Sequence, residues 1–304
     1  MIIVAGGTGL IGQKLISELG KNDKIITITR KKSEWKENLL EWGEIFEEKW
    51  IEKLKTEREK IIINLAGENI GKIWTKATKK KILESRLNST KTVVELAEKI
   101  KAQKLINASA IGYYGDTGNE EKDEKSKVGN SFLANVCNMW EQEAKKVESS
   151  KLYILRIGVV LDKKAKIISS SITPFFIVNP FGQGQNYISW IHIDDLIQVI
   201  KDIIEGKFEK NDKDAAGKML KLPETVINCV SPNPVKANEF IKTISQIKKR
   251  KIISIPQIIL ELILGKDFVR ETISISQRIR PSFLIEKGFK FKYPDIKSAL
   301  ENII

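Results

Sequence analysis

The chain has 304 residues, of which 41% are hydrophobic, 7% aromatic and 30% charged. This composition indicates a folded chain with a sizeable core, and it excludes a disordered protein, a collagen and a small disulfide-stapled scaffold. The formal net charge is +13 at pH 7, but lysines scattered among glutamates on predicted helix surfaces produce it, so we expect no nucleic-acid partner.

Apolar strands and amphipathic helices alternate through the first half of the chain. Strands are predicted over residues 1–5, 24–29, 60–65, 104–109 and 151–157, and helices over 10–19, 76–101 and 131–148. Because strands that are apolar along their whole length must be covered on both faces, the pattern predicts a doubly wound α/β domain with a parallel sheet, a Rossmann fold.

The pattern changes after about residue 210. A polar linker over residues 209–218 precedes one more strand, over 226–230, and then mostly helical patterns. We therefore divide the chain into an α/β domain over 1–215 and a smaller, mostly helical C-terminal portion over 225–304. Ligands of doubly wound folds lie at the carboxyl ends of the strands, so we expect the C-terminal portion to contribute substrate contacts there.

A glycine-rich turn joins the first predicted strand to the first predicted helix, with Gly6, Gly9 and Gly12 spaced as GxxGxxG. Gly6 permits the sharp turn, Gly9 lets a pyrophosphate approach the helix N-terminus, and Gly12 lets the helix pack closely on the strand. The position between a strand and a helix is the one that dinucleotide binding requires. An ordinary glycine-rich turn is the alternative.

The residues that follow the second predicted strand discriminate between nicotinamide cofactors. An acidic residue at this point binds the adenosine ribose of NAD, whereas basic residues suit the 2′-phosphate of NADP. This chain has Arg30, Lys31 and Lys32, and no acidic residue before Glu34. We therefore predict NADP(H) rather than NAD(H), with ordinary surface lysines as the alternative.

Two further strand ends carry candidate site residues. Ala66 and Gly67 follow the strand over 60–65, and such small residues let the backbone run close to a cofactor. Ser109 ends the strand over 104–109, with Tyr113 and Tyr114 just after it. Ser109 is placed to hydrogen-bond a substrate oxygen, and either phenol can act as an acid if its pKa is lowered, so these three are tentative catalytic residues.

Cysteine and histidine counts exclude a zinc cluster and a disulfide framework. The chain has two widely separated cysteines and one histidine, His192, which cannot form a zinc cluster or a disulfide framework and which are compatible with a reducing cytosol. No signal-peptide pattern is present, and no apolar run reaches the ~18 residues of a membrane span, so we expect a cytoplasmic protein without a membrane partner.

His192 precedes a predicted helix over residues 196–204. We expect it to be a structural residue that ties a strand to the core, and we expect Asp194 or Asp195 to cap the helix.

The sequence resembles the epimerase-like, atypical extended short-chain dehydrogenase/reductase family, some of whose members are labelled nucleoside-diphosphate-sugar epimerases or cell-division inhibitors. The resemblance runs through the whole chain, in the segments GGTGLIG, NLAGENI, ESRLNST, SAIGYYGD, FLANVCNMWE, LRIGVVL, SWIHIDDL, NCVSPNPV and GFKFKYPDIKSAL. It implies a small C-terminal domain of unknown function at about residues 250–300.

The resemblance also implies a set of NADP(H)-binding residues. Arg86 enters this set from the resemblance alone, since helical periodicity by itself describes it as a solvated helix residue. The implied set is Gly6, Thr8, Gly9, Leu10, Ile11, Gly12, Arg30, Lys31, Leu65, Ala66, Gly67 and Arg86.

The chain departs from the wider superfamily at the catalytic helix. Extended reductases and epimerases use a Tyr-xxx-Lys pair to move the proton that accompanies hydride transfer. Here the corresponding segment reads FLANVC, and neither register, Phe132 with Val136 or Leu133 with Cys137, supplies a tyrosine or a lysine. Any redox chemistry must therefore recruit Ser109 or another nearby group such as Tyr113, Tyr114 or Glu141.

The sequence thus predicts an NADP(H)-dependent oxidoreductase or epimerase acting on a carbonyl or alcohol of a small molecule, which could be linked to a nucleotide. A non-catalytic NADP(H)-binding sensor is the alternative, and the missing Tyr-xxx-Lys pair supports it. We expect a monomer or a homodimer.

Overall fold

The computed structural model describes residues 1–20, 24–30, 39–182, 184–209 and 224–304. Within these residues, seven parallel strands form a central sheet in the order β12-β7-β5-β4-β1-β2-β3. The strands are β1 (Ile2–Ala5), β2 (Ile25–Thr29), β3 (Leu39–Glu41), β4 (Ile61–Asn64), β5 (Lys104–Ala110), β7 (Lys151–Ile157) and β12 (Thr225–Cys229).

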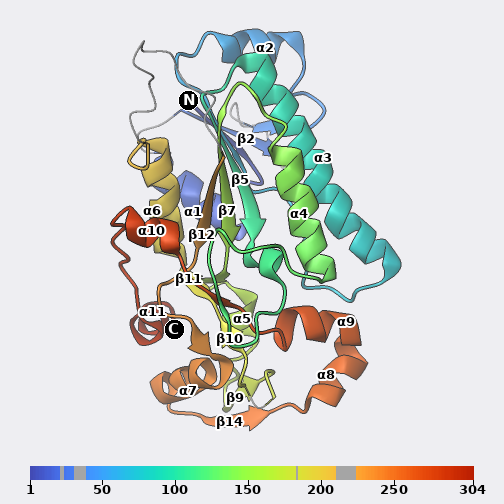
Figure 1. Cartoon of the computed structure of the whole chain (residues 1–304), viewed down its shortest axis with the longest axis vertical. Helices are drawn as coiled ribbons and strands as arrows, with labels where there is room; N and C mark the ends of the chain where they lie inside the picture. Colours follow the sequence, from blue (N-terminus) through green and yellow to red (C-terminus); the bar gives the residue numbers. More distant parts are fainter. Residues whose placement is uncertain (21–23, 31–38, 183, 210–223) are drawn as a thin grey trace.

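Helices cover both faces of this sheet (Figure 1). Alternate side chains of each strand enter different cores: Ile2 and Val4 pack with α1 and α6, whereas Ile3 and Ala5 pack with α2 and α3. The predicted doubly wound α/β fold is therefore confirmed. The flanking helices are α1 (Leu10–Leu19) and α6 (Ile193–Ile204) on one face, and α2 (Glu48–Lys55), α3 (Lys76–Ile100) and α4 (Phe132–Ala144) on the other.

Short strand pairs and helices gather beyond the carboxyl ends of the sheet (Figure 1). The strands are β6 (Glu121–Lys122), β8 (Val159–Leu161), β9 (Phe176–Asn179), β10 (Tyr187–Ile188), β11 (Trp190–His192), β13 (Val235–Lys236), β14 (Lys251–Ser254) and β15 (Arg278–Ile279). The helices are η1 (Ile111–Tyr114), α5 (Lys166–Ser169), α7 (Ala237–Lys248), α8 (Gln257–Leu264), α9 (Lys266–Phe268), η2 (Val269–Ile273) and α11 (Ile296–Ile303). By contrast, α10 (Ser282–Glu286) lies against β12, and its Leu284 packs in a core of the central sheet.

These elements form the C-terminal lobe, whose main core includes the fully buried Trp190 and Phe240. This core lies among β8, α5, β9, β10, β11, β13, α7 and α11. β12, which precedes most of the lobe in the chain, is an edge strand of the central sheet. The predicted linker lies outside the described residues beyond Glu209, so the boundary between residues 215 and 225 stays a prediction. Among the described residues, no helix combines the length and the apolar character needed to cross a lipid bilayer.

His192 is the structural residue that the sequence predicts, and it also caps α6. Its buried ring accepts a hydrogen bond from the Asp194 backbone N–H at Nδ1 (3.1 Å), and its Nε2 lies 3.1 Å from Oδ1 of Asn302 in α11. The ring packs on Tyr293, with 3.9 Å between the ring centroids. Since one ring nitrogen accepts while the other donates, the neutral ring joins β11 to the C-terminal helix.

The expectation that Asp194 or Asp195 caps α6 is wrong. The helix begins at Ile193, so both aspartates lie inside its first turn. Asp195 instead accepts hydrogen bonds from the backbone N–H groups of Lys292 (2.7 Å) and Tyr293 (3.1 Å), and Asp194 pairs with Lys292 and Lys14. The carboxylates therefore hold the C-terminal segment against α6 rather than closing the end of the helix.

We expect the stability of the protein to fall below about pH 6.5, the ordinary pKa of histidine. Burial lowers the pKa of His192, so the unfolded chain binds the proton more tightly than the folded chain. The stabilisation is complete above the ordinary pKa and is lost as the pH falls toward the lowered one. Thermal unfolding followed by circular dichroism at about pH 7.5 and about pH 5.5 measures this change.

His192→Asn is the matched control, because asparagine keeps a capping oxygen but has no proton to bind. Its Tm is expected to fall less over the same interval, since the chain has no second histidine. An equal fall of Tm in both proteins would contradict the assignment to His192.

Candidate functional site

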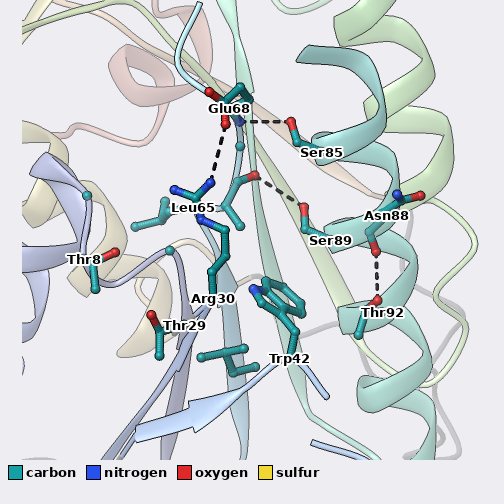
Figure 2. Close-up of a pocket in the computed structure, with 15 residues that line it drawn as sticks. Thr8, Thr29, Arg30, Trp42, Leu65, Glu68, Ser85, Asn88, Ser89 and Thr92 are labelled. Carbon is teal, nitrogen blue, oxygen red and sulfur yellow. Dashed lines mark hydrogen bonds and ion pairs between the residues drawn. The ribbon is translucent and has the colours of Figure 1, made fainter. Parts of the chain in front are cut away.

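A pocket of about 510 Å³ lies at the carboxyl ends of β1, β2 and β4 (Figure 2). One wall is the turn between β1 and α1, another is the segment after β4, and the third is the adjacent face of α3. The lining residues are Gly6, Thr8, Gly9, Ile28, Thr29, Arg30, Trp42, Leu65, Ala66, Gly67, Glu68, Ser85, Asn88, Ser89 and Thr92.

The glycine-rich turn is pressed against its neighbours, which accounts for two of its glycines. Gly6 has a φ of +81°, and a Cβ there would lie 2.7 Å from the backbone of Leu65. A Cβ on Gly12 would lie 2.5 Å from the carbonyl oxygen of Gly6. By contrast, a Cβ on Gly9 would meet only that oxygen, at 3.4 Å. Gly6 and Gly12 thus have no room for a side chain, whereas Gly9, between them, borders the pocket.

Leu10, Ile11 and Gly12, in the first turn of α1, are not among the residues that line this pocket. Leu10 packs against the core of the C-terminal lobe, and Ile11 packs against a core of the central sheet. Gly9 is the N-cap and supplies no side-chain cap. The first N–H groups of a helix lack partners within it and attract anions, so Leu10, Ile11 and Gly12 can contribute through their N–H groups.

The segment after β4 is held in place by α3. The Ser85 hydroxyl accepts a hydrogen bond from the Glu68 backbone N–H at 2.9 Å, and the Arg86 guanidinium donates to the Glu68 carbonyl at 3.1 Å. Arg86 also packs against Gly67, where a Cβ would lie 3.3 Å from the guanidinium carbon, and over the ring of Trp140. Arg86 therefore positions the pocket wall and is not among its lining residues.

Arg30 crosses the mouth of the pocket toward an acidic side chain. It follows β2, its side chain is 86% exposed, and its Nη1 lies 3.6 Å from Oε2 of Glu68 (Figure 2). Lys72 bonds to the same carboxylate, and this bond lowers the pKa of Glu68, which is therefore ionised at neutral pH. Lys31, the neighbour that the sequence also assigns to the cofactor, lies outside the described residues.

Sequence reasoning missed the contribution of α3 to this pocket. Ser85, Asn88, Ser89 and Thr92 are spaced at i, i+3, i+4 and i+7, so they form one polar stripe on a lysine-rich helix. This spacing could have indicated a ligand-facing side of the helix, because the stripe consists of short, uncharged side chains. The sequence analysis also missed Trp42, which follows β3 and lines the pocket. No local sequence pattern indicates that β3 pairs with β2, and this pairing is what places Trp42 at the pocket.

Of the three candidate catalytic residues, Ser109 and Tyr114 lie in a second, buried cluster, whereas Tyr113 is partly buried beside it. The Ser109 hydroxyl donates to Oε1 of Glu141 in α4 at 2.7 Å. The same carboxylate forms a two-point ion pair with Arg156 of β7, at 2.9 Å from Nε and 2.8 Å from Nη2. The side chains of Ser109, Glu141 and Arg156 are all buried. Ser109 therefore belongs to a charge-paired network that joins β5, α4 and β7.

The two tyrosines of η1 differ in their surroundings. The Tyr114 hydroxyl is buried, donates to Oδ1 of Asn228 at 2.6 Å and accepts from Arg156 Nη1 at 2.9 Å. Burial raises the pKa of Tyr114, which is opposite to the direction that an acid role requires. Tyr113 is only partly buried, and the Arg156 guanidinium lies 3.4 Å from the centroid of its ring.

Comparisons with known proteins identify two families. Residues 2–134 match the NAD dependent epimerase/dehydratase family, and residues 255–303 match a domain of unknown function, DUF1731. The chloroplastic SDR39U1 homolog of Arabidopsis thaliana, an epimerase family protein, is 32% identical over 316 residues, which cover 100% of this chain and 86% of that protein. An epimerase family protein of Staphylococcus aureus is 31% identical over 314 residues, which cover 99% and 98%.

A solved structure extends the likeness to the fold. The crystal structure of the human epimerase family protein SDR39U1 with NADPH matches with a TM-score of 0.84 at 24% identity, over 99% of this chain and 98% of that chain. The family resemblance in the sequence is therefore confirmed. On the strength of the full-length relatives, the chain belongs to the epimerase family, with an NAD dependent epimerase/dehydratase domain followed by the C-terminal domain of unknown function.

Proposed function

We propose that the chain binds NADP(H) in the pocket of Figure 2. The observation that carries the proposal is Arg30 at the mouth of a pocket whose floor is the glycine-rich turn. The turn between β1 and α1 offers N–H groups to a pyrophosphate, and a cation after β2 suits an adenosine 2′-phosphate. The bound NADPH in the human relative supports the same cofactor here.

The residues that line the pocket support a dinucleotide as its ligand. Gly9 has no side chain, so its backbone is accessible where phosphates would lie. Ala66 and Gly67 are small, so the opposite wall leaves space for the ligand. Trp42 lines the pocket and supplies an aromatic surface near Arg30 (Figure 2). In this proposal the residues that the sequence assigns to the cofactor fall into three groups. The turn from Gly6 to Gly12 binds phosphates, Arg30 with Lys31 binds the 2′-phosphate, and Leu65 to Gly67 with Arg86 form the remaining wall.

We propose an oxidoreductase or epimerase-like reaction on a carbonyl or alcohol of a small molecule. Bound nicotinamide supplies hydride chemistry, and the chain's own residues must place the substrate oxygen and move a proton. Of Ser109, Tyr113 and Tyr114, the phenol of Tyr113 is the best placed proton donor, because it is partly exposed and its ring lies against Arg156. Ser109 and Tyr114 would act within the buried network that orients Arg156.

A second candidate function, a non-catalytic NADP(H) sensor, is favoured by one specific observation. The hydroxyls of Ser109 and Tyr114 are both committed to buried partners, Glu141 and Asn228, and α4 carries no Tyr-xxx-Lys pair. A protein that binds NADPH tightly but leaves it unchanged across a panel of aldehydes, ketones and UDP-sugars, and that binds a protein partner only in one cofactor state, would establish the sensor.

Arg30→Ala is expected to weaken NADPH binding by about 10- to 100-fold, the range for losing one charge-assisted contact to a phosphate. NADH binding should change little, because NADH has no 2′-phosphate. Energy transfer from tryptophan to the bound nicotinamide, with Trp42 in the pocket wall, gives both affinities. Equal affinities of the unaltered protein for NADPH and NADH would overturn the NADP(H) assignment.

Glu68→Gln is expected to strengthen NADPH binding by about two- to fivefold, the range for relief of one partly exposed charge interaction. The ionised carboxylate pairs with Arg30 and competes with an incoming phosphate for the same guanidinium. The same titration measures the effect, and the gain should shrink at high salt. Weaker binding in Glu68→Gln would show that the carboxylate serves the cofactor directly.

Tyr113→Phe is expected to lower turnover by about 100-fold or more, the usual contribution of a general acid. NADPH affinity should stay unchanged, because Tyr113 does not line the cofactor pocket. The assay is NADPH oxidation with whichever substrate the panel yields. Turnover that is unchanged in Tyr113→Phe, Tyr114→Phe and Ser109→Ala would remove all three from the reaction.

A further inference from the structure

α8 presents an apolar face to solvent. Ile258, Ile259, Leu262 and Ile263 are 68%, 44%, 82% and 62% exposed, whereas Leu260 is buried. At 100° per residue the four exposed side chains cover one continuous side of the helix, and Leu260 points to the other. A surface helix of a globular protein has the reverse arrangement, with its polar side outward.

More apolar side chains lie exposed at the same end of the molecule. β14 leads directly into α8, and its Ile252 and Ile253 are 37% and 49% exposed. β14 pairs in parallel with β9, just before which Phe175 is 83% exposed. Figure 1 shows α7, β9, β14 and α8 together at the end of the molecule opposite α2. Clusters of this kind mark interaction surfaces.

Basic residues flank this apolar surface. The segment from Lys248 to Lys251 joins α7 to β14 and consists of three lysines and one arginine. Arg250 donates to the Thr173 carbonyl at 2.6 Å, so the segment is fixed beside the loop that carries Phe175. Lys249 and Lys251 are exposed, and among the described residues neither forms an ion pair with a carboxylate.

We propose that α8, β14 and Phe175 form a surface that docks onto an anionic phospholipid bilayer, which differs from the expectation, drawn from the sequence, of no membrane partner. The four apolar side chains of α8 would enter the interface, while the cations of residues 248–251 lie at the level of the lipid phosphates. An apolar surface with a basic segment beside it is the arrangement that binds anionic lipid surfaces without spanning them. An interfacial helix needs no spanning length, so the eight residues of α8 suffice.

Charge favours a bilayer over a second copy of the chain as the occupant. Two copies would bring two sets of residues 248–251 toward one another, and the whole chain carries a formal charge of +13. Glu261 is the acidic residue within α8, and it is only partly exposed and accepts a hydrogen bond from Gln257. An anionic bilayer matches both the apolar face and the cations. The proposal is independent of cofactor binding.

The test is flotation of the full chain with vesicles of phosphatidylcholine alone and of an equimolar mixture of phosphatidylcholine and phosphatidylglycerol. We expect binding to the mixed vesicles that weakens as salt is added. Ile258→Ser with Leu262→Ser is expected to lower the bound fraction by about tenfold or more, because two inserted side chains are lost. Lys249→Gln with Lys251→Gln is expected to weaken binding and reduce its salt dependence.

Matched controls are Ile73→Ser, which removes an isoleucine that is 60% exposed near the start of α3, and Lys53→Gln with Lys55→Gln on α2 at the opposite end of the molecule (Figure 1). Both are expected to bind like the unaltered chain. Unchanged circular dichroism and NADPH titration show that each variant is folded.

Three results would overturn the proposal. The first is no flotation with either vesicle at low salt, and the second is flotation that the α8 variant leaves unchanged. The third is a lipid-free dimer, seen by analytical ultracentrifugation, that Ile258→Ser with Leu262→Ser converts to monomer, because the surface would then be an interface between two copies.

Discussion

The architecture of the cofactor pocket depends on the contact between the glycine-rich turn and the segment after β4. Gly6 lies so close to the backbone of Leu65 that a Cβ on Gly6 would collide with it. A Cβ on Gly12 would collide in the same way with the carbonyl oxygen of Gly6. This contact fixes the ends of β1 and β4 and the start of α1 relative to one another. Because the contact is made by backbone, the glycine-rich turn can line the pocket through Gly6, Thr8 and Gly9. The proposed phosphate recognition relies on the N–H groups of this turn.

The two clusters of site residues are built in opposite ways. The pocket is lined by backbone and short side chains, and its charges, Arg30 and Glu68, lie at an exposed mouth where water screens them. The second cluster is buried and holds a full ion pair between Glu141 and Arg156. Removing one partner of such a pair leaves a buried charge uncompensated, at a cost of about 3–5 kcal/mol. The side chains at the pocket mouth can therefore change position when a ligand binds, whereas the buried cluster must keep its geometry. That geometry includes the position of the Arg156 guanidinium against the ring of Tyr113.

The C-terminal lobe combines firm attachment with an exposed apolar end. His192, Asp195 and Asn302 connect its last segment to β11 and α6 through hydrogen bonds that involve buried side chains. At the far end, α8 turns its isoleucines and a leucine to solvent. A lobe held by these bonds would keep the epimerase/dehydratase domain in a fixed orientation on any surface that α8 contacts.

The sequence by itself determined the alternation of strands and helices, the parallel sheet and the glycine-rich turn, because these depend on short-range apolar patterns and on glycine spacing. It also identified Gly6, Thr8, Gly9, Arg30 and the residues after β4 that line the pocket. Only the tertiary structure decided the rest. The wall from α3, the pairing of Arg30 with Glu68 and the partners of Ser109 each join segments distant in sequence. The cap of α6 was misplaced because any acceptor near a helix start can serve, and packing against Tyr293 selected His192.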